Sequence, residues 1–176
     1  AVGSSLGAYL VRVSLRPALV LGWSQLALVG AVPWAAFAIN QVLPFWTLEP
    51  TALQHLGVKF GHDLARASMA ILPATILWGA SFPLALAAAA GHSDEPGRLV
   101  GGIYASNTLG AIVGAIAFGI VIIPWVGTQQ AQQALTLLAG AAGIAILVAA
   151  ASRMGKLRRF SGLLVPVAIF VALMVS

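Results

Sequence analysis

Long apolar runs, separated by short polar segments, organise this chain from end to end. A helix of roughly 20 mainly apolar residues is long enough to cross the hydrocarbon core of a bilayer. We therefore predict an all-α fold: a polytopic transmembrane helical bundle that forms a single domain over residues 1–176, with four complete spans and a partial helix at each end. The expected helices cover residues 1–11, 17–43, 62–90, 101–127, 128–152 and 161–176.

Composition agrees with the membrane class. Hydrophobic residues make up 60% of the chain and charged residues only 7%, whereas a soluble domain has roughly 25% charged residues. The net charge of +5 could attract nucleic acid. The basic residues lie in short segments between apolar runs, however, so we expect the lipid bilayer as a partner and no nucleic acid. The chain begins without Met inside one apolar run and ends inside another, which favours a segment of a longer protein.

The run at 101–127 has a small residue at every fourth position. This spacing puts the small residues on one helix face, where a second helix can approach closely in a membrane. Asn107 lies at the edge of that face, and a buried amide needs a hydrogen-bond partner. We expect other transmembrane helices, of the same or neighbouring chains, to pack on this stripe. The predicted helix-packing residues are Gly102, Ser106, Asn107, Gly110, Gly114 and Gly119.

Prolines interrupt two of the expected spans. Pro33 lies inside 17–43, and Pro73 and Pro83 lie inside 62–90. Each proline removes one backbone hydrogen bond and should bend its helix. Broken helices mark substrate sites in many transporters, but kinks also simply shape helix bundles. The expected partner for the amide of Asn107 is a carbonyl freed by Pro73 or Pro83, or a Ser or Thr hydroxyl on a neighbouring helix. Gln25 is a second polar residue within a span.

The connection at 47–61 is the longest polar one, and it could hold a short helix on the membrane surface. Leu56 and Phe60 belong to the apolar side of that helix. Trp46 lies just before the connection, at the depth of an aromatic belt. Asp63 and Arg66 are three residues apart at the start of the next span, so we expect them to form an ion pair.

Basic residues are distributed unevenly between alternate connections, and this predicts orientation. The second and fourth connections hold only Lys59 and Arg66. By the positive-inside rule, the connections at 12–17, 91–98 and 153–159 are then cytoplasmic, in an integral membrane protein that we expect in a bacterial inner (plasma) membrane. The cluster at 153–159 could bind anionic lipid headgroups, or serve only as a topology signal. Its residues are Arg153, Lys156, Arg158 and Arg159.

The chain has few residues that could catalyse a reaction or bind a metal. None of the four acids, Glu49, Asp63, Asp94 and Glu95, is expected at mid-membrane. His55 and His62 flank the start of a span at a spacing that is irregular for a metal site. With no cysteine, disulfide and thiolate chemistry are excluded. We predict no catalytic, cofactor-binding or metal-binding residue in this segment, and no cofactor.

Two segments carry a family resemblance. WGASFPLALA at 78–87 and GGIYASNTLGAIVGAIAFGIVIIPWVG at 101–127 resemble the membrane region of spermidine-synthase-like integral membrane proteins. In that family a GA-x-FPL segment precedes a helix with a Y-A-x-NT-x-GA-I-x-G run and an IP-x-x-G exit. The matching residues are Gly79, Ala80, Phe82, Pro83, Leu84, Tyr104, Ala105, Asn107, Thr108, Gly110, Ala111, Ile112, Gly114, Ile123, Pro124 and Gly127.

The resemblance implies a helical membrane domain attached to a cytoplasmic, Rossmann-like aminopropyltransferase domain. In such enzymes decarboxylated S-adenosylmethionine donates an aminopropyl group to the polyamine precursor putrescine. This segment lacks the glycine-rich loop and the acidic amine-binding residues of that domain, so no catalytic residue carries over. The expected function is to anchor or serve such a polyamine transferase domain. The alternative is a transporter half, or a small integral subunit of a larger membrane complex.

Overall fold

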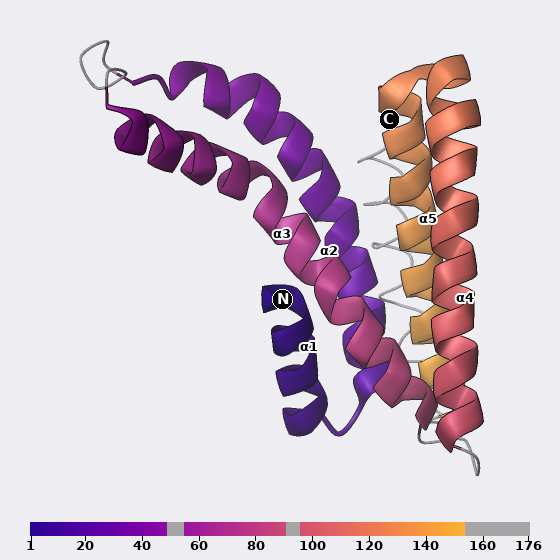
Figure 1. Cartoon of the computed structure of the whole chain (residues 1–176). Helices are drawn as coiled ribbons and strands as arrows, with labels where there is room; N and C mark the ends of the chain where they lie inside the picture. The colour runs from indigo at the N-terminus through magenta and orange to yellow at the C-terminus, as the bar shows by residue number, and fades with distance from the viewer. Residues whose placement is uncertain (49–54, 91–95, 154–176) are drawn as a thin grey trace.

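In the computed structural model, which describes residues 1–48, 55–90 and 96–153, nearly every described residue is helical and no strand occurs among them. This confirms the all-α fold class. Figure 1 shows the helices as a row of long rods with one short helix, α1, against them. The elements are α1 (Val2–Val13), α2 (Pro17–Phe37), the π-turn η1 (Ala38–Val42), the 3₁₀ turn η2 (Leu43–Phe45), α3 (Leu56–Ala90), α4 (Pro96–Ile116), the π-turn η4 (Ala117–Ile122) and α5 (Ile123–Arg153).

Three helical stretches within the described residues are long and apolar enough to span a membrane. They are Pro17–Phe45, Leu56–Ala90 and Gly97–Ser152. The third contains Gly127, whose φ of 86° and ψ of 167° interrupt the helix. A positive φ is easy only for glycine, because it has no Cβ. The chain reverses direction there, so that α4 ascends to this point and α5 descends from it (Figure 1).

The apolar core joins α2 to its neighbours on both sides. Helix α2 packs against both α3 and α5, and α1 packs against α3. One buried cluster consists of Leu21, Ala80 and Leu84, and a second consists of Leu28, Ala31 and Ala74. In both clusters alanines face leucines, which lets these helices lie close together along most of their length.

The closest helix approach is between α1 and α3. A methyl group added at Gly7 would lie 2.6 Å from Pro83 Cγ and 2.8 Å from the backbone of Ala80, and one added at Gly3 would lie 2.5 Å from the carbonyl oxygen of Ile76. Gly3 and Gly7 have the Gly-x-x-x-Gly spacing that lets two membrane helices touch backbone to backbone. Among the described residues, α1 therefore makes a glycine-mediated contact with α3, and Gly22 of α2 and Gly143 of α5 make a second one.

The predicted packing of the α4 stripe is not found among the described residues. A methyl group added at Gly102, Gly110, Gly114 or Gly119 meets no atom of a described residue within 4 Å. The α3–α4 contact includes the large rings of Phe82 and Tyr104. Rings of this size keep the two backbones apart, whereas Gly3 and Gly7 meet only small residues or backbone on α3.

Helix α3 begins at Leu56, earlier than predicted, so Leu56 and Phe60 belong to its first turns and both are exposed. The rest of the predicted surface helix, 49–54, lies outside the described residues. The expected Asp63–Arg66 pair is not formed. Instead, Arg66 Nη2 donates a hydrogen bond of 2.8 Å to the carbonyl oxygen of Leu43. The same carbonyl accepts the backbone N–H of Trp46 at 3.2 Å, and a cation is favourable at the carbonyl end of a helix.

Prolines bend α2 and α3 together. Pro33, Pro73 and Pro83 all lie inside helices, and Figure 1 shows the two helices curving side by side. Because Pro73 has no N–H, it leaves the carbonyl of Met69 without its usual helical donor. The indole Nε1 of Trp34 donates to that oxygen at 3.2 Å. The partner of the carbonyl freed by Pro73 is therefore Trp34 and not Asn107.

Candidate functional site

A cleft of about 880 Å³ lies between four helices and is the best candidate site in the described structure. It is mostly apolar, with a few polar groups, which is the usual character of a small-molecule site. Its described lining comes from α2, α3, α4 and α5. The residues are Leu21, Gln25, Trp78, Ser81, Phe82, Ala85, Ala89, Leu99, Gly102, Ile103, Ser106, Asn107 and Ile146.

A hydrogen-bonded pair forms the polar part of the α2–α3 wall. Gln25 Nε2 donates to Ser81 Oγ at 2.9 Å, and Ser81 Oγ donates to the carbonyl oxygen of Leu77 at 2.9 Å. A polar side chain among apolar helices needs such a partner. Interhelical bonds of this kind contribute on the order of 1 kcal/mol in membranes. The pair therefore fixes how α2 and α3 are rotated relative to each other at the cleft.

Ser106 and Asn107 supply the polar part of the α4 wall. Both side chains are exposed, and no described residue forms a hydrogen bond with either. The predicted hydrogen bond from Asn107 to a neighbouring helix is thus absent from the described part of the chain. Its amide lines the cleft, together with the amide of Gln25 and the hydroxyl of Ser81.

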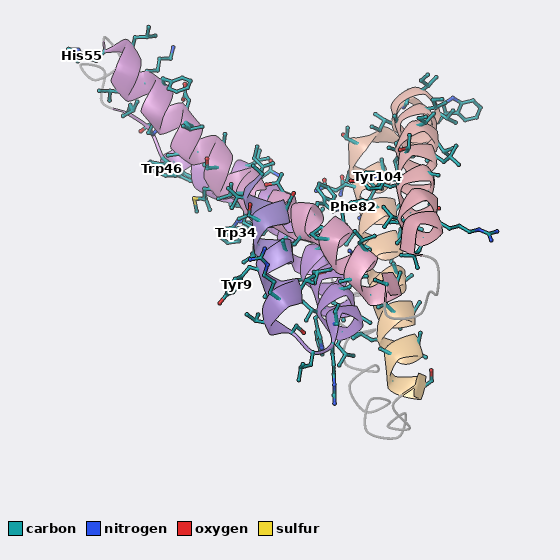
Figure 2. All side chains as sticks on the ribbon, turned by 60° about the horizontal axis from the view of Figure 1, so that its bottom comes forward. Tyr9, Trp34, Trp46, His55, Phe82 and Tyr104 are labelled. Carbon is teal, nitrogen blue, oxygen red and sulfur yellow. The ribbon has the colours of Figure 1, made fainter. Side chains whose placement is uncertain are left out.

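Two aromatic rings join α3 to α4 beside the cleft. Phe82 and Tyr104 meet edge to face, with ring centroids 4.8 Å apart and planes at 67°, a preferred aromatic geometry. Figure 2 shows the two residues together where α3 passes α4. Phe82 belongs to the 78–87 segment and Tyr104 to the 101–127 segment, so the two segments that carry the family resemblance are in direct contact.

The cleft is suited to binding rather than to acid–base chemistry. Its described lining contains no carboxylate, amine, guanidinium or imidazole. General acid–base catalysis requires a group that exchanges a proton near neutral pH, and a bound polycation requires carboxylates to offset its desolvation. The described walls therefore fit a largely apolar ligand that also offers neutral hydrogen-bonding groups.

His55 and His62 lie far from this cleft, at the other end of α3. His62 is largely buried: its Nδ1 is 3.8 Å from Asp63 Oδ1, and its Nε2 has no hydrogen-bond partner among the described residues. The ring packs edge-on against Trp46 at 5.6 Å. His55 is exposed at the tip of the α2–α3 pair (Figure 2). No group of three potential ligands that could hold a metal occurs among the described residues.

Sequence reasoning located part of this site. It named Gln25, Gly102, Ser106 and Asn107 as residues of note, and all of them line the cleft. It missed Ser81, because a serine in a helix gives no sign of which helix it faces. Of the predicted lipid-headgroup residues, Arg153 ends α5, and Lys156, Arg158 and Arg159 lie outside the described residues.

No known protein family, curated protein or solved structure matches this chain. The resemblance to spermidine-synthase-like proteins therefore rests on the two motif segments alone.

Proposed function

We propose that this chain is the membrane-embedded helical domain of a spermidine-synthase-like protein, and that it anchors or serves a polyamine aminopropyltransferase domain outside this segment. One observation carries the proposal. The two segments of the resemblance meet in the ring contact between Phe82 and Tyr104, and residues of both segments line the same cleft. Segments that share a contact and a cleft behave as one structural unit.

The proposed membrane arrangement has four complete spans, formed by α2, α3, α4 and α5, with a partial helix at each end. The reversal at Gly127 supports counting α4 and α5 as separate spans. In Figure 1 the α1–α2 connection, the end of α3 and the start of α4 lie at one end of the molecule. That end carries Arg12, Arg16 and Arg98, so we assign it to the cytoplasmic side of a bacterial inner membrane.

A transporter half, or a small integral subunit of a larger membrane complex, is the alternative. The bent helices α2 and α3 beside a cleft of about 880 Å³ favour it. The described lining argues against a polyamine as cargo, because no carboxylate is present to bind a cation. The anchoring function is therefore preferred.

Membranes containing the full-length protein are expected to transfer an aminopropyl group from decarboxylated S-adenosylmethionine to putrescine. Removing residues 1–176 should move this activity to the soluble fraction, because the apolar spans would be gone. The measurement is methylthioadenosine formation in each fraction. A full-length protein without transferase activity, which instead carries labelled putrescine into proteoliposomes, would replace this proposal with the transporter alternative.

Single-cysteine labelling is expected to show opposite exposure at the two ends. The chain has no native cysteine, and Leu15 and His55 are both exposed. An impermeant thiol reagent added outside intact cells should label His55→Cys, and should label Leu15→Cys only after the membrane is opened. The reverse pattern would invert the assigned orientation, and labelling of both sites from outside would contradict the membrane topology altogether.

A further inference from the structure

A second cavity, of about 550 Å³, lies where the start of α2 meets the last turns of α3 and α5. Its walls are almost entirely apolar and are built largely from alanines. Ala85, Ala88 and Ala89 come from α3, and Ala149 and Ala150 come from α5. Small side chains leave the space between these helices unfilled, so the cavity is an apolar groove.

One cation lies on this groove. Arg16 belongs to the lining, its side chain is exposed, and no described residue forms an ion pair or hydrogen bond with its guanidinium. The hydrogen bond from residue 16 to Ser14 Oγ uses its backbone N–H. Described residues therefore leave all of its donors to a ligand, and planar guanidinium groups bind phosphate with paired hydrogen bonds.

We propose that an anionic phospholipid binds in this groove, with an acyl chain along the alanine walls and its phosphate on Arg16. The inference rests on the membrane placement proposed above. An apolar groove beside a guanidinium that no described residue pairs with complements an amphiphile with an anionic head. A free phosphate has no apolar part to bury against the alanine walls. A zwitterionic lipid carries a positive group that the guanidinium would repel.

The groove is continuous with the larger cleft, which gives the acyl chain room to extend. Leu21, Ala85, Ala89 and Ile146 line both cavities. A lipid held at Arg16 would thus reach toward the Gln25–Ser81 pair and cover apolar walls of α3 and α5. Its site is formed by packed helices.

The test measures association of spin-labelled phosphatidylglycerol and phosphatidylcholine with the protein in bilayers. The wild-type chain is expected to prefer phosphatidylglycerol about fivefold, the ratio that corresponds to ~1 kcal/mol per basic residue near the surface. Arg16→Gln should abolish the preference. Arg12→Gln removes the same charge at the same end of the molecule, outside the groove lining, and should keep it. Ala149→Leu fills the groove and should also lower the preference.

Three results would overturn the proposal. One is an unchanged preference in Arg16→Gln, and another is an equal loss in Arg12→Gln, which would show a general surface-charge effect. The third is displacement of the labelled lipid by millimolar inorganic phosphate at constant ionic strength, which would assign Arg16 to a soluble anion. If neither lipid is immobilised by the protein at all, the membrane placement itself fails, and that outcome is distinct from a loss of selectivity.

Discussion

Gly7→Leu is expected to separate α1 from α3 and to lower the free energy of unfolding by about 3 kcal/mol, at the upper end of the usual cost of overpacking. The reason is the backbone contact. Even a methyl group at this position would lie 2.6 Å from Pro83 Cγ and 2.8 Å from the Cα and carbonyl oxygen of Ala80. Backbone atoms cannot move aside by changing rotamer, so the helices themselves must move apart.

Gly110→Leu is the matched control for this substitution. It makes the same chemical change inside a helix, but a methyl group at Gly110 meets no described atom within 4 Å. Its effect should stay within ~0.5 kcal/mol, as for an ordinary surface substitution. Unfolding of both variants in detergent, followed by helical circular dichroism, gives the comparison. Equal losses would mean that the α4 stripe packs as closely as α1 does, as the sequence alone suggested.

The purified 176-residue chain is expected to transfer no aminopropyl group. The reaction requires carboxylates that bind the amine and accept its proton, together with a pocket that excludes water. The cleft lining shows no carboxylate among its described residues. Asp63 is near the start of α3 and Ser81 lies 18 residues later on the same helix, about 27 Å away at ~1.5 Å per residue.

Methylthioadenosine formation from putrescine and decarboxylated S-adenosylmethionine is the measurement, with the full-length protein as the positive control. Turnover above background by the 176-residue chain would contradict the prediction. If Asp94→Asn or Asp63→Asn abolished that turnover, the carboxylate would belong to a site that the cleft does not contain.

Hydropathy predicted the helices well because it records how the chain partitions between water and lipid. It also anticipated the break between the fourth and fifth runs, where Gly127 takes a positive φ. It placed the start of α3 too late, because it indicated a polar connection at 47–61 with a separate short surface helix. Polar residues do not end a helix by themselves, and α3 continues through them from Leu56.

Helix partners were harder to predict than helices. A stripe of small residues shows that a helix can be approached closely, but not by which neighbour. Gly3 and Gly7 had the same spacing as the α4 stripe, and the structure uses them. The Gln25–Ser81 bond joins residues 56 positions apart. Predicting it requires the rotation of α2 and α3 about their axes, and both helices are too uniformly apolar for their sequences to reveal that rotation.

The hydrogen bond from Trp34 to the Met69 carbonyl restrains the bend in α3. A helix bent at a proline is normally free to flex, because the missing hydrogen bond removes a restraint at the bend. Here the indole of α2 holds the unpaired carbonyl of α3, and Arg66 of α3 holds the carbonyl of Leu43 where η2 begins. The two bent helices are thus joined by hydrogen bonds at two levels, which restrain flexing at the bend. We therefore expect α2 and α3 to move as one unit.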